Sequence, residues 1–265
     1  MPFLKSFSIN TAKTQPFPFN VPAVRFARDL ELDPGVTIFV GDNGCGKSTL
    51  METLGFQLDL PLIGGYEKPG RSFQAAQLLQ SFLELEWRRT TPNGFFFRAE
   101  DFSDFIKSVE REQSRIAGEL EELKGNVQES VIREMSDGMS YHLNAMRRNY
   151  GSDMEGYSHG EAYMKILETR IENKGIFILD EPEAALSPVK QLSLIFLILQ
   201  KLKTGNTQFI ISTHSPILMG IPNALIYEVR EFGMDPVTFE NTEHYLVTKQ
   251  FLANPDAYLR YFEEE

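Results

Sequence analysis

A glycine-rich stretch at residues 41–49, Gly-Asp-Asn-Gly-Cys-Gly-Lys-Ser-Thr, has the spacing of a loop that binds phosphate groups. Glycines let backbone N–H groups curl around phosphate oxygens, and the N-terminus of a following helix adds positive partial charge. Lys47 is expected to reach the β- and γ-phosphates of a nucleotide, and the Ser48 hydroxyl is expected to ligate Mg²⁺. The apolar run at 36–40 predicts a buried strand before the loop, and residues 48–54 predict a helix after it. The candidate cofactor-binding residues of this stretch are Gly41, Asn43, Gly44, Cys45, Gly46, Lys47, Ser48 and Thr49.

Two acidic residues, Asp180 and Glu181, follow a second apolar run at 176–179. The run is typical of a buried parallel strand, and ligands of open α/β sheets sit at the carboxyl ends of such strands. Asp180 is expected to hold Mg²⁺, directly or through water, and Glu181 is expected to orient or deprotonate an attacking water. Alone, the two acids could be an ordinary strand-to-turn junction. Together with the glycine-rich loop, they predict hydrolysis of the bound nucleotide.

A histidine stands at the end of a third β-rich run, Phe-Ile-Ile-Ser-Thr-His-Ser-Pro at 209–216. His214 would lie at the C-terminal edge of a strand, near the same crevice. Its imidazole could hydrogen-bond the γ-phosphate and sense its loss. The competing interpretation is a loop histidine bonded to backbone. Because the glycine-rich loop and the acidic strand end are also present, the sensor role is favoured. Lys47, Glu181 and His214 are the candidate catalytic residues.

A fourth element, Gly-Tyr-Ser-His-Gly-Glu at 156–161, precedes a plausible helix. Ser158 and Glu161 have the spacing of a capping box, so the segment could simply cap that helix. Ser158 and Gly160 at a helix N-terminus also make an anion site. Such a site usually cannot serve the nucleotide of its own subunit, which the phosphate loop already surrounds. Ser158, Gly160 and Glu161 are therefore candidate cofactor-binding residues for a neighbouring subunit.

In this order the four elements resemble the ATP-binding-cassette (ABC) class of ATPases, as Walker A, signature, Walker B and switch histidine. The residues around Asp180 and His214 are similar to those of the soluble ABC-class ATPases. These include recombination-F-like, OLD-like and small "predicted AAA-family" ATPases of bacteria. The resemblance spans residues 17–262. It implies an α/β P-loop fold with a mostly parallel sheet, an N-terminal antiparallel sheet and a helical lobe. It also implies ATP and Mg²⁺ as cofactors, and an ATP-dependent homodimer that buries two ATP molecules.

Three departures from the family pattern affect what the resemblance implies. The signature of the family usually reads Ser-Gly-Gly-Gln or Ser-x-Gly-Glu, and here its second position is His159. Ser187 stands where an aspartate usually crosses to the partner subunit. No glutamine that could ligate Mg²⁺ follows the expected strand at 95–97, and Arg98 or Glu100 are the candidate substitutes.

The whole chain, residues 1–265, is expected to form one ATPase domain. A helical lobe at about 101–160 is expected to be inserted between Walker A and Walker B. Within the lobe, apolar residues repeat at helical steps from 101 to about 135, and a mobile loop is expected over 136–153. The histidines at 142, 159 and 244 do not have metal-ligand spacing. His244 beside Glu243 could contact the nucleotide or a partner, but an ordinary surface pair is the favoured interpretation. The other expected elements are strands at 3–9, 24–32, 83–87 and 95–97, helices at 73–80 and 192–199, a strand–turn–strand after 226, and a helix from 248.

The amino-acid composition limits the classes of protein to which this chain can belong. The chain has 265 residues, 42% hydrophobic and 24% charged, which is typical of a globular protein. The net charge of −11 opposes tight sequence-independent binding to DNA phosphates. The single cysteine, Cys45, fits a reducing compartment, and no signal peptide or membrane-spanning run is expected. A cytoplasmic protein without membrane insertion is therefore expected.

Three functions remain open on the sequence. The first is an ABC-class ATPase whose cycle drives a conformational change in an unknown protein or nucleic-acid partner, with DNA maintenance or phage defence as plausible settings. The second is the nucleotide-binding subunit of a membrane transporter, against which the absent glutamine and aspartate count. The third is a weakly hydrolysing, ATP-dependent scaffold, suggested by the unusual signature.

Overall fold

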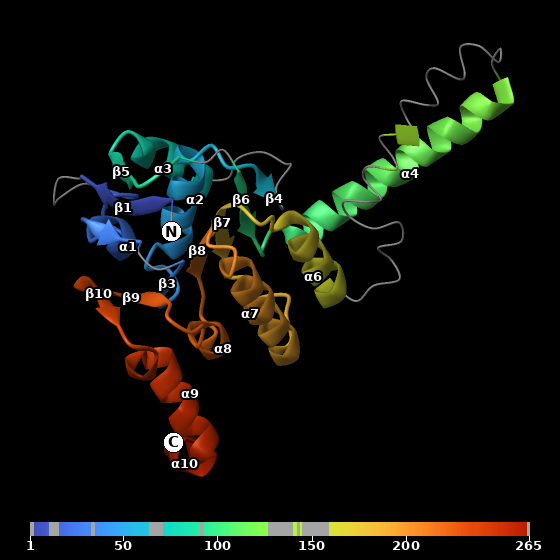
Figure 1. Cartoon of the computed structure of the whole chain (residues 1–265). Helices are drawn as coiled ribbons and strands as arrows, with labels where there is room; N and C mark the ends of the chain where they lie inside the picture. The colour runs from blue at the N-terminus through green and yellow to red at the C-terminus, as the bar shows by residue number, and fades with distance from the viewer. Residues whose placement is uncertain are drawn as a thin grey trace.

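A mostly parallel sheet runs through the middle of the molecule in this computed structural model, which describes residues 3–10, 16–32, 35–63, 71–90, 93–126, 140–141, 144 and 159–263 (Figure 1). The strand order is β10-β9-β3-β8-β7-β6-β4, and every neighbouring pair is parallel except β10 with β9. The strands are β3 (Val36–Gly41), β4 (Leu62–Ile63), β6 (Gly94–Arg98), β7 (Gly175–Asp180), β8 (Thr207–Ser212), β9 (Leu225–Arg230) and β10 (Gly233–Val237). The α/β class and the strands expected around 36–40, 95–97 and 176–180 are confirmed.

An antiparallel sheet, in the order β2-β1-β5, lies beside the parallel one. Its strands are β1 (Leu4–Ile9), β2 (Leu30–Glu31) and β5 (Leu83–Trp87). Gln208 of β8 joins the two sheets, because its fully buried amide accepts from the N–H groups of Phe3 and Leu4 at 3.0 and 2.9 Å. The same amide donates to the carbonyls of Leu4 and Leu32 at 2.8 and 3.0 Å. The expected N-terminal antiparallel sheet is therefore present.

The strand expected over 24–32 is wrong for most of its length. A short helix, α1 (Pro22–Arg25), occupies its beginning, and only Leu30–Glu31 pair as a strand. Proline is preorganised for the first helical position, which starts the helix at Pro22. Asp29 has φ of 49°, which breaks the extended backbone before β2. The apolar residues Val24, Ala27, Leu30 and Leu32 are still buried in the core, but only Val24 is in the helix.

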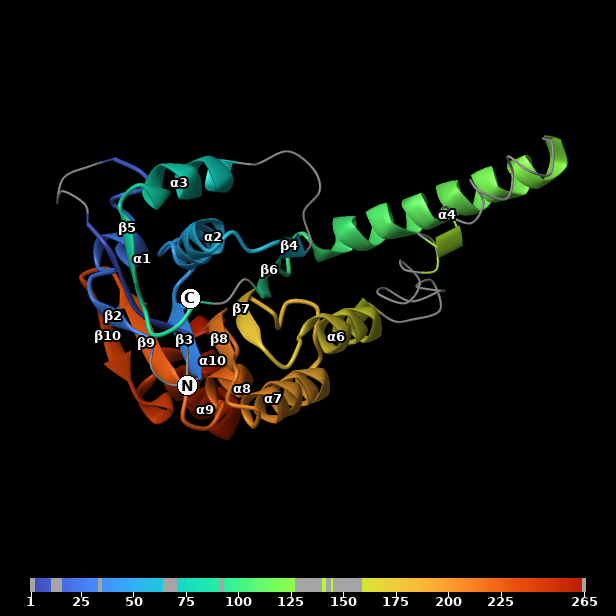
Figure 2. The same ribbon diagram turned by 45° about the horizontal axis from the view of Figure 1, so that its top comes forward.

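Both faces of the parallel sheet are buried, as expected for a sheet of this kind. Along β3, Val36, Ile38 and Val40 pack into the core on one face, and Phe39 packs into the core on the other. The helices divide between these faces, as Figure 2 shows. The face of the sheet that carries Phe39 is covered by α1, α2 (Lys47–Gln57) and α3 (Arg71–Gln80). The opposite side holds the base of α4 (Phe102–Asn126), α6 (His159–Arg170), α7 (Pro188–Leu202) and α8 (Pro216–Met219).

The predicted helical lobe begins with α4, a 25-residue helix that projects from the body of the molecule (Figures 1 and 2). Its first turns are anchored, since Phe102, Phe105 and Ile106 are buried in the main core. Residues 127–135 of the expected helix and nearly all of the expected loop at 136–153 lie outside the described residues.

The helix expected to be buried over 192–199 is amphipathic instead. Leu194 and Ile198 of α7 are fully buried, while Leu192 and Phe196 are 57% and 62% exposed. A nearly continuous apolar run, interrupted at Ser193, hides this periodicity, because its other positions are apolar whichever way they face.

The C-terminal part contains the expected hairpin of β9 and β10, followed by the 3₁₀ turn η1 (Phe239–Asn241), α9 (Glu243–Ala253) and α10 (Pro255–Glu263). Helix α9 begins before the expected residue 248, because Thr242 Oγ1 accepts from Tyr245 N at 3.4 Å and caps it. None of the helices in the described part of the chain is both long and apolar enough to cross a membrane.

Candidate nucleotide site

The glycine-rich loop connects the end of β3 to the start of α2, and its backbone needs glycine. Gly41, Gly44 and Gly46 have φ values of 147°, 81° and 96°, a region that side chains rarely adopt. A Cβ on Gly46 would lie 2.6 Å from Val21 Cγ2, and one on Gly41 would lie 2.4 Å from Val229 O. Asn43 and Gly44 are exposed at the tip, whereas Thr49 is buried in the first turn of α2. The loop thus has the strand–loop–helix context that the sequence predicts.

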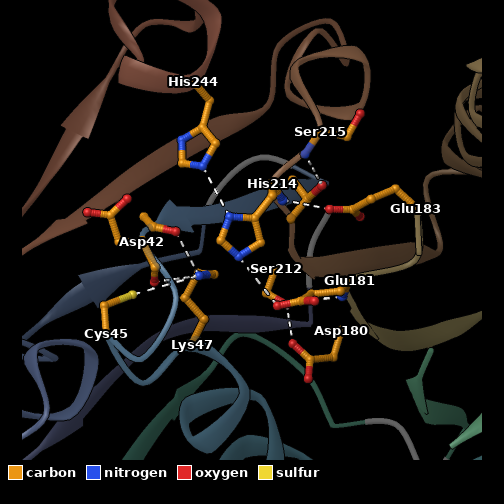
Figure 3. Close-up of polar contacts among 12 residues, drawn as sticks. Asp42, Cys45, Lys47, Asp180, Glu181, Glu183, Ser212, His214, Ser215 and His244 are labelled. Carbon is orange, nitrogen blue, oxygen red and sulfur yellow. Dashed lines mark hydrogen bonds and ion pairs between the residues drawn. The ribbon is translucent and has the colours of Figure 1, made fainter. Parts of the chain in front are cut away.

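Lys47 folds back over this loop (Figure 3). Its Nζ donates to the carbonyls of Gly41 and Asp42 at 2.7 and 3.1 Å and lies 3.8 Å from Cys45 Sγ. These neutral acceptors are ones that phosphate oxygens can replace, because a charge-assisted bond to an anion is stronger than a bond to a carbonyl. Burial raises the pKa of the Cys45 thiol, and the charge of Lys47 only partly opposes this. Cys45 is therefore a neutral small residue of the loop.

Ser48 and Asp180, the two predicted metal ligands, lie together. The Asp180 carboxylate accepts from Ser212 Oγ, and the Ser48 side chain lies near enough to it to lower its pKa. Burial raises the pKa of Asp180 to about 6, while Ser212, Ser48 and the charge of Arg98 act in the opposite direction. In the described chain no three or more His, Cys, Asp or Glu side chains group as metal ligands. The oxygens of Ser48 and Asp180 suit Mg²⁺, which uses one or two protein oxygens together with waters and phosphate oxygens.

Glu181 and His214, two of the predicted catalytic residues, face each other from the ends of β7 and β8. His214 Nε2 lies 3.4 Å from Glu181 Oε1, and the nearby imidazole lowers the pKa of Glu181. Glu181 has φ of 48°, an uncommon conformation for a residue other than glycine. Its backbone N–H donates to Ser212 O at 3.0 Å, which fixes the acid at the sheet edge. Glu181 is therefore an ionised carboxylate that is 41% exposed and available to bind water.

Two residues that the sequence analysis did not place in the site contact His214. Glu183 Oε1 accepts from the His214 backbone N–H at 2.6 Å, which holds the loop after β8. His244, from α9, has its Nε2 3.1 Å from His214 Nδ1 (Figure 3). The expected surface pair of His244 with Glu243 is replaced by this contact, while Glu243 N–H donates to Glu228 Oε1 at 2.8 Å. Sequence spacing gives no signal for the contact between His214 and His244, because the two residues lie in separate elements, 30 residues apart in the chain.

Arg98, a candidate substitute for the metal-ligating glutamine, is nearly buried among carboxylates. It contacts Glu52 of α2 and its own neighbours Glu100 and Asp101. A guanidinium has no acceptor, so Arg98 cannot replace an amide oxygen on a metal. Its contacts instead connect α2, which follows the phosphate loop, to β6. A role for Glu100 as the substitute stays a prediction.

The predicted signature is only partly described. Ser158 lies outside the described residues, and α6 begins at His159. Gly160 packs closely, since a Cβ there would lie 3.2 Å from Ala185 O. Glu161 is exposed in the first turn. In both views α6 lies apart from α2 (Figures 1 and 2), so the roles of Ser158, Gly160 and Glu161 stay predictions.

Two family models match this chain, one over each half of the site. The model described as "AAA domain", residues 23–77, contains the glycine-rich loop. The model described as "AAA domain, putative AbiEii toxin, Type IV TA system", residues 131–220, contains Asp180, Glu181 and His214. Both models describe AAA domains, so over these two stretches the chain is similar to AAA-type ATPase domains. The resemblance stated from the sequence is thereby confirmed.

Solved structures similar to this P-loop domain include the Smc head domain of Pyrococcus furiosus with an extended coiled coil, bound to the C-terminal domain of ScpA. It is 13% identical with a TM-score of 0.47, and the match covers 94% of this chain and 100% of that chain. Another is MJ1267, an ATP-binding cassette of an ABC transporter in its ADP conformation. It is 14% identical with a TM-score of 0.46, and the match covers 99% of each chain. No curated protein matches the chain.

The chemistry available to this P-loop domain follows from the groups gathered at one sheet edge. A cation and backbone donors lie in the loop, and a hydroxyl paired with a buried carboxylate lies beside them. An ionised glutamate with a histidine neighbour completes the set. Donors for phosphate, oxygens for Mg²⁺ and a base for water are thus in one place.

Proposed function

We propose that this chain hydrolyses ATP to ADP and phosphate with Mg²⁺ as cofactor. The observation that carries the proposal is the closeness of Ser48, at the end of the phosphate loop, to the Asp180 carboxylate at the acidic end of β7, beside the 3.4 Å approach of Glu181 to His214. The two halves of a nucleotide site come from strands β3 and β7, which are separated in the sheet by β8. Their meeting is what a triphosphate with a bound metal requires.

Each side chain takes one role in the proposal. Lys47 exchanges its carbonyl acceptors for β- and γ-phosphate oxygens, and the loop N–H groups bind the remaining phosphate oxygens. Mg²⁺, when bound, would be held by Ser48 and Asp180 and would neutralise phosphate charge. Glu181 accepts a proton from, or orients, the water that attacks the γ-phosphorus. His214 donates to the γ-phosphate and registers its departure.

The proposal includes an ATP-dependent homodimer. The start of α6 lies apart from α2, so a second copy would have to bring Ser158, Gly160 and Glu161 to the nucleotide (Figure 2). Two ATP molecules would then be buried between the subunits, and loss of the γ-phosphate would loosen the interface. That cycle would change the conformation of a protein or nucleic-acid partner. Residues 1–265 would act as one domain in it, with the lobe at 101–160 as its insertion.

The cellular settings proposed are phage defence and DNA maintenance. The description of one matched family names a toxin–antitoxin system, which supports a search for the partner in phage defence. DNA maintenance is the other setting, and the cytoplasm is the compartment proposed for both. A weakly hydrolysing scaffold remains the second candidate, because His159 changes the signature.

Phosphate release from ATP and Mg²⁺ tests the proposal. Glu181→Gln keeps the shape of the side chain and removes its basicity, so kcat should fall by about 100-fold or more, with ATP still bound. Glu168→Gln, at an exposed position of α6, is the matched control and should keep the parental rate. Equal rates for Glu181→Gln and the parent would reject the hydrolytic role. A parent that binds ATP but does not turn it over would favour the scaffold.

A further inference from the structure

We propose that His244, in the C-terminal helix α9, is a positioning residue that holds His214 with an N–H directed at the γ-phosphate. The inference rests on the proposed function, and it adds a residue from outside the four motif elements. The contact that carries it is the 3.1 Å approach of His244 Nε2 to His214 Nδ1. Both imidazoles are partly buried at the edge of the site (Figure 3).

The His214 ring lies between two partners, one on each nitrogen. Nε2 faces the Glu181 carboxylate at 3.4 Å, and Nδ1 faces His244. A carboxylate oxygen is an acceptor, so this geometry is favourable when Nε2 carries a hydrogen. Neutral His214 then has a lone pair on Nδ1, and a hydrogen on His244 Nε2 can be donated to it.

Protonation of His214 leaves the same side of its ring unchanged. His244 then carries its own hydrogen on Nδ1, so His214 Nδ1–H donates to the lone pair of His244 Nε2, and His214 Nε2–H still faces Glu181. In both states the Glu181 carboxylate favours the tautomer with Nε2–H, and His244 holds the ring in place through its contact with Nδ1. The logic is that of a nucleophile–base–orienting group arrangement, in which the third group fixes a histidine ring.

His244 can do this because the start of α9 is firmly held. The Thr242 side chain caps the helix, and Glu243 N–H donates at 2.8 Å to Glu228 Oε1 of the central sheet. Glu228 is itself buried and paired with Arg230. The titratable groups that face His244 are His214 from the loop after β8, Lys47 and Asp42 from the phosphate loop, and Glu228 from β9.

Three variants of α9 separate positioning from general stability. His244→Gln keeps an amide that can donate to His214 Nδ1, and His244→Leu removes every polar group. Thr248→Leu puts the same leucine at an exposed position of the helix and is the matched control. Loss of one hydrogen bond predicts kcat about tenfold lower for His244→Leu, with KM for ATP changed by less than about threefold. His244→Gln and Thr248→Leu should both keep kcat within about threefold of the parent.

Imidazole ¹⁵N spectra of the protein without ATP give a readout independent of turnover. With four histidines in the chain, the ring signals can be assigned by substitution. His214 should have a protonated Nε2 in the parent and in His244→Gln, and a mixture of tautomers in His244→Leu. The inference is overturned if His244→Leu keeps the parental kcat and tautomer, or if His244→Gln loses as much as His244→Leu. A parent that releases no phosphate but has the expected tautomer would reject the proposed function and leave the histidine pair standing.

Discussion

Arg98 and Glu52 form an ion pair in which the Glu52 side chain is fully buried and the Arg98 side chain is 11% exposed. The pair links β6, beside the acidic strand β7, to the helix that follows the phosphate loop. Because Arg98 is the register partner of Asp180 in β7, its positive charge also reaches the proposed metal ligand.

Removing one partner of this pair should destabilise the protein strongly. Arg98→Met leaves Glu52 as an uncompensated buried charge, so the free energy of unfolding should fall by about 3 kcal/mol or more. The double variant Arg98→Met/Glu52→Leu should recover much of that loss. Arg115→Met, which breaks two exposed ion pairs on α4, is the control and should change the unfolding free energy by less than about 1 kcal/mol. Urea unfolding measures all of these, and equal losses at 98 and 115 would refute a structural role for the buried pair.

Asp180 should make the ATP-free protein less stable as pH rises. Its pKa is raised from 3.8 to about 6, so between these values the native state binds more protons than the unfolded state. The free energy of unfolding therefore falls as pH rises through that window. Asp180→Asn cannot titrate, and at pH 7 it should be more stable than the parent by roughly 3 kcal/mol. The gain should shrink toward pH 4 in denaturant titrations, and a gain that does not vary with pH would contradict the burial of this charge.

Gly46 should not tolerate a side chain. Its φ of 96° and the 2.6 Å approach of a Cβ to Val21 mean that Gly46→Ala must distort the loop. We expect ATP affinity to fall by tenfold or more, about 1.4 kcal/mol of binding energy, in calorimetric titrations. Gly118→Ala, at an open position of α4, is the control and should keep the affinity and slightly stabilise the helix. Parental affinity in Gly46→Ala would mean that the loop does not bind the phosphates.

Glu181→Gln should trap an ATP-bound dimer. Without the base, the γ-phosphate persists and the proposed interface does not loosen. Size exclusion with light scattering in saturating ATP and Mg²⁺ should give twice the monomer mass, and addition of a chelator should restore the monomer. A variant that stays monomeric with bound ATP would contradict the proposed pairing of subunits.

Local patterns explain what could be predicted from the sequence. The residue types at 41–49 and 176–181 determine a loop and an acidic strand end, and both are formed by neighbouring residues along the chain. The strand expected at 24–32 failed, because apolar residues at that length also suit a short helix begun by Pro22. The exposed side of α7 was hidden by its nearly continuous apolar run. His244 could not be placed, because its contact with His214 depends on how α9 packs and on the Glu228 anchor.

The most direct test of the central claim is a crystal structure of the protein with Mg²⁺ and a non-hydrolysable ATP analogue. The account predicts that the metal contacts Ser48 and Asp180, directly or through water, that Lys47 Nζ has moved from the loop carbonyls to the β- and γ-phosphates, and that Glu181 faces the γ-phosphorus. A nucleotide bound elsewhere, or a metal remote from Asp180, would contradict it.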